Sequence, residues 1–340
     1  MKNSDSKISF FRKLLTFINV VSISLQLYSM GSFGGVSQFP LLAFAVPFLM
    51  VFNLLFFIFW TLRFKWPALL FIGLLVIGIQ ELGLLYQVGN KGISTADGLH
   101  VMSFNVRSFN RYRWLKNIAV AEEIKNFVES CQTDLICFQE FAVNEAPKFE
   151  AFPYQKFKPY TPNGKIGTCI ISKYPLINTQ PITFSESKNG GIQADVIWKG
   201  DTIRVYNLHF ESFRLDQNDT LLSSNYSDKL RKKLDAVLET QKRQVAEFNS
   251  FISGHTYPEV ICTDLNNNAF SASYKALKKD RMDSFTGSGS GLGATYRFLL
   301  YPLRIDFIFN SSDLKVVEFN THQVKLSDHK PISAKIVTDF

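Results

Sequence analysis

Two long runs of apolar residues lie in the first third of the chain. Leu41 to Leu62 contains no charge, and Trp66 to Val88 is interrupted only by Glu81. A helix of about 20 predominantly apolar residues can cross the hydrocarbon core of a bilayer. A buried core helix gives the same pattern, but two such runs joined by the short charged link 63–65 favour two membrane spans. Glu81 lies near the end of its run, where we expect a snorkelling or helix-packing role.

A weaker apolar stretch, 14–30, precedes these runs. Six polar residues dilute it: Thr16, Asn19, Ser22, Ser24, Gln26 and Ser29. Its pattern fits a third span, an interfacial helix or the core of a signal peptide. A cleaved signal is disfavoured because no clear small-x-small cleavage site follows it, whereas further apolar runs do. We therefore predict a transmembrane anchor over 1–92, with helices at about 14–30, 41–62 and 66–88.

The pattern changes after a linker at 93–98. Short runs rich in β-branched and aromatic residues recur, which is typical of strands. They are Leu99–Asn105, Leu135–Gln139, Thr168–Ser172, Ala194–Trp198, Ile203–Leu208, Val260–Thr263, Ile305–Phe309 and Ile332–Val337. Apolar residues at helical spacing predict helices over Ile118–Ser130 and Ser227–Ile252. The alternation of strands and helices predicts an α/β domain over 99–340.

The longer expected helix carries basic residues on the face opposite its apolar stripe. They are Lys229, Arg231, Lys232, Lys233, Lys242 and Arg243. A solvated helix face is the usual meaning of such charge, and contact with anionic lipid or substrate is the alternative. The Gly/Ser-rich stretch Gly287–Gly293 is expected to be a flexible loop.

The formal net charge of +8 is unevenly distributed along the chain. Residues 1–96 hold seven basic and two acidic side chains, so +5 belongs to the apolar N-terminal part and +3 to the rest. Basic residues precede the first expected span and occupy the link 63–65, whereas the loop 31–40 has none. Under the positive-inside rule, the N-terminus and that link are cytoplasmic, and three spans place residues after 90 outside the cytoplasm. Two spans would put these basic groups on opposite sides, so the three-span arrangement is the self-consistent one.

The four cysteines, Cys131, Cys137, Cys169 and Cys262, all belong to the expected α/β domain. Their spacing matches no zinc-binding pattern. Buried structural thiols are the favoured interpretation. A disulfide stays open, because a compartment outside the cytoplasm permits one.

Several expected strands end in a residue that can bind a metal ion or a phosphate group. These residues are Asn105, Glu140, His209, Asp264 with Asn266, Asp306, and Asp328 with His329. Any one of them alone is explained by turn formation. All of them in one domain fit the hydrolysis of a phosphate ester, which needs a hard divalent cation, a group that orients water, and donors to the phosphoryl oxygens.

The residue types suggest a division of labour. Glu140 and Asp328 suit the cation, and Asp264 suits the water. The amide and imidazole groups suit the phosphate oxygens: Asn105, Asn266 and His209. Asp306 and His329 allow a carboxylate–imidazole pair, in which the carboxylate fixes the imidazole tautomer and favours its charged form.

The order of these motifs resembles that of the endonuclease/exonuclease/phosphatase superfamily, the DNase I-like metal-dependent phosphoesterases. The resemblance covers about 98–340. The motifs that carry it are Ser103-Phe-Asn105-Val-Arg, Cys137-Phe-Gln-Glu140, Asn207-Leu-His209, Thr263-Asp264-Leu-Asn266, Arg304-Ile-Asp306 and Ser327-Asp328-His329. It implies a four-layer α/β sandwich of two mixed β-sheets flanked by helices, with the site at one edge of the sheets.

The resemblance also implies roles for the matching residues. Glu140 is the expected main Mg²⁺ ligand, with Asn105 close to metal and phosphate and Asp328 a second metal-site carboxylate or an orienting group. His209 contacts the phosphate, and Asn266 stabilises the phosphoryl oxygens. Asp264 positions the attacking water, and Asp306 pairs with His329. Two positions next to expected catalytic residues depart from the family pattern. Thr263 stands where the family usually has glycine, and Phe210 stands where it usually has leucine. Neither change removes a functional group.

The expected function is a membrane-anchored hydrolase of phosphate esters that uses Mg²⁺, with Mn²⁺ as the alternative cation. Its expected partners are a lipid bilayer, through residues 14–88, and a nucleic-acid or phospholipid headgroup substrate; no protein partner is inferred. A tight nucleic-acid binder needs a strong basic excess, and a charge of +3 on the domain argues mildly against one. A nuclease, a lipid phosphodiesterase and a non-catalytic adaptor that binds phosphate in the same pocket stay open.

Overall fold

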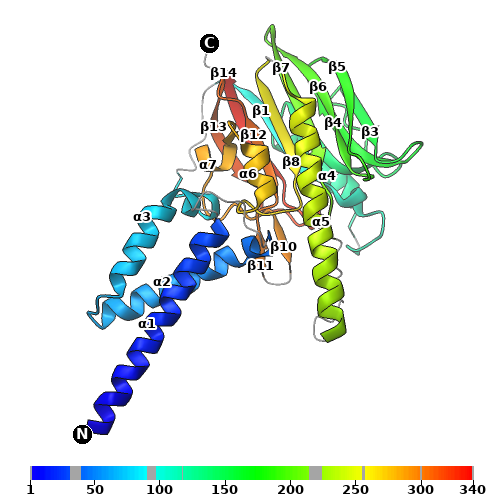
Figure 1. Cartoon of the computed structure of the whole chain (residues 1–340). Helices are drawn as coiled ribbons and strands as arrows, with labels where there is room; N and C mark the ends of the chain where they lie inside the picture. The colour runs from blue at the N-terminus through cyan, green and yellow to red at the C-terminus, as the bar shows by residue number, and fades with distance from the viewer. Residues whose placement is uncertain are drawn as a thin grey trace. The chain divides into compact units, whose positions relative to one another are not determined.

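The computed structural model describes residues 2–30, 40–89, 97–116, 118–213, 224–254, 257–298 and 301–338. The chain divides into two units (Figure 1), one comprising Met1–Leu85 with Phe270–Ala272 and the other Tyr86–Ala269 with Ser273–Phe340. The expected linker 93–98 and the uncharged loop 31–40 fall mostly outside the described residues. The domain boundary at residue 92 stays a prediction.

The first unit is helical. It contains α1 (Lys2–Met30), the short 3-10 helix η1 (Pro40–Ala45), α2 (Val46–Leu62) and α3 (Ala68–Leu85). Two segments have the length and apolar composition of a membrane span, Ser9–Ser29 and Leu41–Leu62. The third expected span, 66–88, is helical over α3, but the side chains at 75 and 77–80 lie outside the described residues.

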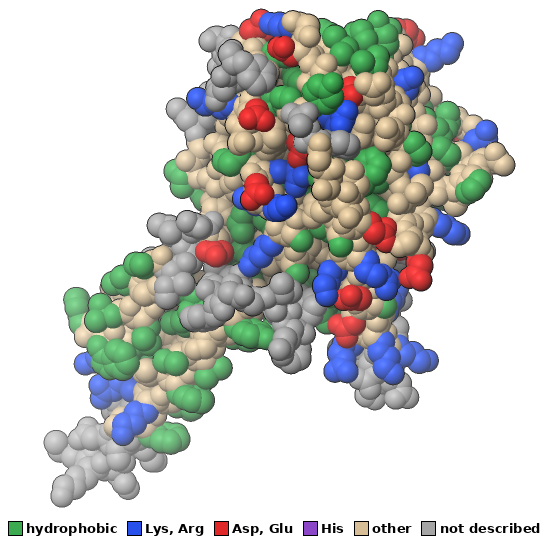
Figure 2. Space-filling model, turned by 45° about the horizontal axis from the view of Figure 1, so that its top comes forward, with side chains coloured by type: hydrophobic (Ala, Val, Ile, Leu, Met, Phe, Trp, Pro, Cys, Tyr) green, Lys and Arg blue, Asp and Glu red, His purple; other side chains and the backbone are tan. Residues whose placement is uncertain are grey.

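Two of the polar residues that dilute the stretch 14–30 contact another helix. Asn19 and Gln26 on α1 are buried, and both meet the buried Asn53 of α2, whose side-chain amide donates to Gln26 Oε1 at 2.7 Å. Most of the residues that α1 exposes are apolar, and Phe10 and Phe17 are 70% and 65% exposed. Polar groups inside and apolar groups outside are the arrangement expected of helices that pack in lipid. Figure 2 shows apolar side chains spread over the surface of this unit.

The second unit contains two six-stranded sheets. The first has the order β13-β14-β1-β2-β4-β3, from strands β1 (Leu99–Asn105), β2 (Leu135–Ala142), β3 (Tyr154–Pro159), β4 (Ile166–Ser172), β13 (Leu314–Thr321) and β14 (Ile332–Thr338). The second has the order β5-β6-β7-β8-β12-β9, from β5 (Leu176–Thr183), β6 (Gly190–Trp198), β7 (Asp201–His209), β8 (Glu259–Asp264), β9 (Met282–Asp283) and β12 (Asp306–Asn310). A separate hairpin joins β10 (Tyr296–Phe298) to β11 (Tyr301–Leu303). Both sheets are mixed, because β1 with β2 and β7 with β8 pair in parallel and the other pairs are antiparallel.

Helices cover the outer faces of the two sheets. The inner faces share one apolar core, to which Val101 and Cys137 contribute from the first sheet and Val205 and Cys262 from the second. On the other face of the first sheet lie α4 (Val120–Ser130) and the short helix η2 (Arg107–Asn110). The aromatic residues of the second sheet pack on α5 (Ser224–Phe251) and α6 (Ala272–Lys278), which Figure 1 shows in front of that sheet. The short helix α7 (Ser284–Ser288) follows β9. The expected four-layer α/β sandwich is confirmed.

All eight strands predicted from the sequence are present, and the strands missed have a common position. β13 and β3 end the first sheet, and β5 and β9 end the second; the remaining two form the hairpin β10–β11. A strand at the edge of a sheet is partly solvated, so its hydrophobic pattern is weak. In β3, for example, the first three residues are all exposed. The four cysteines are free thiols, and three of them are buried.

Candidate active site

The strand topology brings several of the candidate site residues to one edge of the sandwich. The parallel strands β1 and β2 carry Asn105 and Glu140 at or near their carboxyl ends, and the parallel strands β7 and β8 end at His209 and Asp264. The carboxyl ends of parallel strands lie at the same sheet edge. Antiparallel β12 begins opposite Asp264, which places Asp306 beside it.

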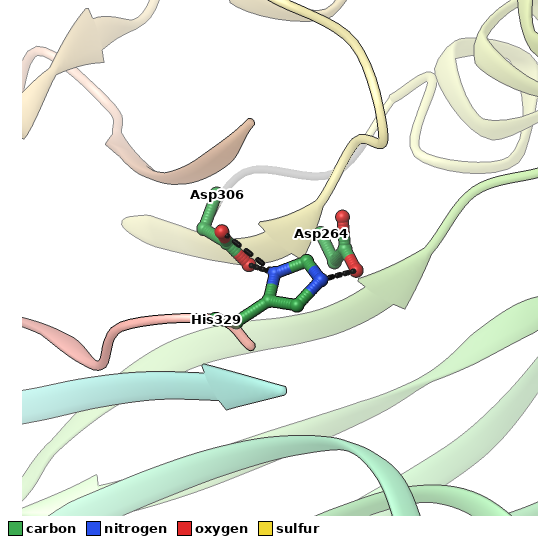
Figure 3. A group of neighbouring side chains, drawn as sticks. All are labelled: Asp264, Asp306 and His329. Atoms are coloured by element: carbon green, nitrogen blue, oxygen red, sulfur yellow. Dashed lines mark hydrogen bonds and ion pairs between the residues drawn. The ribbon is translucent and has the colours of Figure 1, made fainter. Parts of the chain in front are cut away.

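Asp264, Asp306 and His329 form a buried group (Figure 3). Both carboxylate oxygens of Asp306 lie 3.0–3.1 Å from Nδ1 of His329, and Nε2 of the same ring lies 3.7 Å from Oδ2 of Asp264. One potential ligand atom from each residue lies within 4.8 Å of the others. The imidazole therefore joins two carboxylates, and the pairing of Asp306 with His329 expected from the sequence is present.

Asn105 connects this group to Glu140. Its side-chain amide donates to Asp264 Oδ2 at 2.8 Å and to Glu140 Oε1 at 3.2 Å, while its Oδ1 accepts the backbone N–H of Arg107. Its carbonyl oxygen accepts the Ser327 hydroxyl at 2.8 Å. With its amide nitrogen turned toward the carboxylates, Asn105 acts in this arrangement as a donor rather than as an oxygen ligand.

Glu140 sits in a distorted part of β2. The register of the β2–β4 pair shifts between Phe138 and Phe141, and Glu140 has a φ of +51°. A positive φ is uncommon for a residue other than glycine and is found often at functional sites. The bulge turns the Glu140 carboxylate to the rim, where one-third of its side chain is exposed.

His209 is held on one ring nitrogen and presents the other to the site. Tyr160, just after β3, lies with its hydroxyl 2.6 Å from Nδ1, and the same hydroxyl accepts the Glu140 N–H at 3.0 Å. Nε2 lies 3.6 Å from Asp264 Oδ2 and 4.0 Å from Glu140 Oε1, and is buried without a hydrogen-bond partner among the described residues. A buried nitrogen without a partner fits a site that binds a polar ligand.

Two residues expected at the site, Asn266 and Asp328, make contacts with groups outside it. The side-chain amide of Asn266 donates to the carbonyl of Phe210 at 3.0 Å, and its backbone N–H donates to Asp264 Oδ1. Asp328 lies 3.3 Å from the guanidinium of Arg107, which stacks on the Trp114 ring. Each lies beside the group rather than within it.

Burial dominates the electrostatics of the site. It raises the pKa of Asp264 to about 6, an effect that the charge of Asp306 increases and that of His329 opposes. It also raises the pKa of Glu140 and lowers that of His209. For His329, burial alone would lower the pKa, but the carboxylates of Asp306 and Asp264 outweigh it and hold the pKa well above its usual value. The site thus combines a His329 whose charged form is favoured with two carboxylates, Asp264 and Glu140, whose charged forms burial disfavours.

Three supporting residues escaped the sequence analysis. One is Tyr160, and another is Thr295, whose hydroxyl accepts the backbone N–H groups of Ile305 and Asp306. The third is the buried Gln241 of α5, whose amide donates to the carbonyl of Glu211 at 2.7 Å and whose oxygen accepts from Asn267. Each lies far along the chain from the group it supports, and only the polarity of Gln241 on a buried helix face was a signal in the sequence.

Comparison with known protein families shows to which family this domain belongs. A sequence profile of the endonuclease/exonuclease/phosphatase family matches residues 102–329. The chain belongs to this family. It is therefore a hydrolase of the class that acts on phosphate esters, as the motif order indicated. None of the curated proteins compared with the chain matches it.

Solved structures share the fold of the family domain. A family member from Bacteroides vulgatus is 15% identical, with a TM-score of 0.56 over 72% of this chain and 100% of its own. The human Nocturnin catalytic domain with bound sulfate is 15% identical, with a TM-score of 0.54 over 72% and 96%. A mannosyl-6-phosphatase from Bacteroides thetaiotaomicron is 17% identical, with a TM-score of 0.53 over 70% and 99%. At these identities the likeness concerns the fold alone.

Proposed function

We propose that the chain is a membrane-anchored, Mg²⁺-dependent phosphoesterase that hydrolyses its substrate by direct attack of water. The observation that carries this proposal is the buried group Asp264–Asp306–His329, joined through Asn105 to the carboxylate of Glu140. It contains the acceptor, the donor and the oxygen ligand that such a reaction requires.

Asp264 positions the attacking water and accepts its proton. With a pKa of about 6, the carboxylate is ionised at neutral pH yet basic enough to take a proton. As the new P–O bond forms and the ester P–O bond breaks, negative charge grows on the phosphoryl oxygens. His329, kept cationic by Asp306, donates from Nε2 to those oxygens, and His209 also donates from its Nε2; both nitrogens lie within 3.7 Å of Asp264 Oδ2.

The residues present fit a divalent cation. Glu140 and Asp264 are carboxylates in a buried site, and one potential ligand atom each from Asp264, Asp306 and His329 lies within 4.8 Å of the others. Burial raises the pKa of Glu140 and of Asp264, which disfavours their charged forms, and a bound cation would offset that cost. Carboxylate oxygens are the ligands that Mg²⁺ prefers, and Mn²⁺ accepts the same set. Glu140 is the proposed main ligand, with Asp328 and Asn105 next to it. When bound, the cation neutralises charge on the phosphoryl group.

The substrate is proposed at the level of its chemistry, a phosphodiester or a phosphomonoester. The structural relatives include a Nocturnin domain and a mannosyl-6-phosphatase, so their names do not favour one class. A nuclease and a lipid phosphodiesterase are the two leading forms. Asn266 completes the proposed phosphate-contacting set, and its amide would have to exchange its bond to the carbonyl of Phe210 for one to the phosphate.

The first unit is proposed as the anchor. Two of its segments meet the length and composition of a span, and the exposed residues of α1 are largely apolar. The basic residues before the first span and at the link 63–65 orient the catalytic domain away from the cytoplasm. Protease added to intact cells should degrade the domain, and full protection there with cleavage after permeabilisation would contradict this orientation.

The test of activity uses the full chain in detergent with bis-p-nitrophenyl phosphate. We expect turnover that EDTA abolishes and Mg²⁺ restores, and that Glu140→Ala lowers at least tenfold. Glu145→Ala, an exposed carboxylate in the turn after β2, is the matched control and should retain activity. A complete lack of metal-dependent turnover would support the alternative, a non-catalytic adaptor.

A substrate panel then separates the classes within the proposal. It contains plasmid DNA, RNA, inositol phosphates, sphingomyelin and phosphatidylglycerol. Nicking of plasmid without cleavage of lipid would identify a nuclease, and the reverse would identify a lipid phosphodiesterase.

A further inference from the structure

Tyr160 lies in the site, although it belongs to none of the motifs found in the sequence. It follows β3, an edge strand, and its hydroxyl lies between two groups on other strands. Nδ1 of His209 is 2.6 Å away, and the backbone nitrogen of Glu140 is 3.0 Å away. Within the described part of the chain, the hydroxyl has no third hydrogen-bond partner.

The single hydrogen of this hydroxyl determines which of its two contacts it donates to. A phenol has one hydrogen to donate and an oxygen that accepts. The N–H of Glu140 can only donate, so the phenol oxygen accepts there. The phenol hydrogen then has a single acceptor within reach, Nδ1 of His209, because leaving a buried O–H unpaired costs free energy.

We propose that Tyr160 is a positioning residue that fixes the neutral His209 ring in the tautomer with hydrogen on Nε2. This inference rests on the proposed function, in which His209 contacts the phosphoryl group. An Nδ1 that accepts from Tyr160 carries no hydrogen, so the ring hydrogen must be on Nε2. Nε2 is the atom that lies unpartnered and buried, facing Asp264 and Glu140 across the site.

The tautomer determines what His209 can do. With hydrogen on Nε2, the ring donates into the space between the two carboxylates, where a phosphoryl oxygen has to be held. In the other tautomer, Nε2 would present a lone pair to two carboxylates and to that oxygen, which is repulsive. Tyr160 therefore converts a histidine that is ambiguous in sequence into a donor with one defined direction.

The ring packing supports the same arrangement. The rings of Tyr160 and His209 lie 5.4 Å apart between centroids, which limits rotation of the imidazole. Because the hydroxyl also holds the N–H of the bulge residue Glu140, Tyr160 connects the proposed metal ligand to the proposed phosphate donor. A purely structural role through Glu140 is the competing explanation, and it predicts a different pattern of effects.

The first test observes the tautomer directly, without turnover. Full-length protein labelled with ¹⁵N-histidine is examined by long-range ¹H–¹⁵N NMR at about pH 8, where an ordinary histidine is neutral, and His209→Gln assigns the signal. We expect an Nε2–H tautomer for His209 in the wild type and in Tyr154→Phe, an exposed tyrosine on β3 that serves as the control. Tyr160→Phe should give a mixture of tautomers. An Nδ1–H tautomer in the wild type, or an unchanged signal in Tyr160→Phe, would overturn the inference.

The second test asks whether Tyr160 acts through His209. Loss of one buried hydrogen bond predicts about a tenfold fall in kcat for Tyr160→Phe. In a His209→Ala background the same change should cost less than about twofold. An equal loss in both backgrounds would assign the effect to Glu140 instead and refute the inference.

Failure of the two proposals is distinguishable. If no phosphate ester is hydrolysed but the wild-type ring has the Nε2–H tautomer, the proposed function fails and the positioning by Tyr160 stands. If turnover is present and the tautomer is wrong, only the role of Tyr160 fails.

Discussion

Replacing Asp306 by asparagine tests the central carboxylate–imidazole pair. The side chain is nearly isosteric, and its backbone N–H still reaches the Thr295 hydroxyl. What changes is the charge on the two oxygens that lie 3.0–3.1 Å from Nδ1 of His329. A hydrogen bond to a charged partner contributes about 1.5–3 kcal/mol. If that stabilisation is used in the transition state, kcat falls roughly 10- to 150-fold.

The variant should also shift the pH profile in a defined direction. The Asp306 carboxylate raises the pKa of His329, so the imidazolium persists above neutral pH in the wild type. Without that charge the pKa falls, and the imidazolium is lost at lower pH. The alkaline limb of the kcat profile therefore moves toward neutral pH, while KM changes little because ground-state contacts are kept.

The assay is hydrolysis of bis-p-nitrophenyl phosphate by the full chain in Mg²⁺, from about pH 5.5 to 9.5, with kcat and KM resolved. Asp313→Asn, an exposed carboxylate in the turn before β13, is the matched control and should behave as the wild type. A kcat within twofold of wild type across the whole range, or a loss confined to KM, would show that the pair does not act on the transition state.

Three further predictions concern stability and support of the site. Asp264→Asn should abolish turnover yet raise the free energy of unfolding by about 1–3 kcal/mol at about pH 8, and this gain should vanish near pH 4. The pKa of Asp264 is about 6 in the folded protein, which exceeds its value in the unfolded chain. Ionisation of the wild-type carboxylate therefore destabilises the fold as the pH rises from the unfolded pKa to the folded pKa. Arg304→Ala should cost about 3–5 kcal/mol in urea unfolding, because it removes the cation that lies 2.7 Å from the buried carboxylate of Asp283. An equal loss from the exposed Arg297→Ala would refute this. Gln241→Ala should cost about 1–3 kcal/mol and raise KM, since its amide ties the loops after β7 and β8; unchanged unfolding would contradict it.

The central strands were predictable because burial leaves a mark in the sequence. β1, β7 and β8 are almost wholly buried, and their apolar runs end in Asn105, His209 and Asp264. Burial of a strand on both faces favours a nearly continuous apolar run, and a polar residue at its end stands out. The order of these residues along the chain was enough to indicate the family.

The edge strands have no such apolar pattern, and Tyr160, a residue of the candidate site, was missed together with β3. β3 alternates little and exposes half its residues, so Tyr160 carried no signal. The polar residues of α1 were also misleading when read alone. They weakened the prediction of a span, whereas Asn19 and Gln26 are buried against Asn53 of another helix.

The sequence by itself therefore determined the class of the fold and the family, because each depends on local hydrophobic pattern and motif order. Only the tertiary structure decided the geometry of the site. It placed Asp306 of β12 opposite Asp264 of β8, turned the Asn105 amide toward two carboxylates, paired Asp328 with Arg107 and set Tyr160 against His209. These contacts join residues tens to hundreds of positions apart, and strand register and side-chain packing, which no local pattern encodes, determine which groups meet.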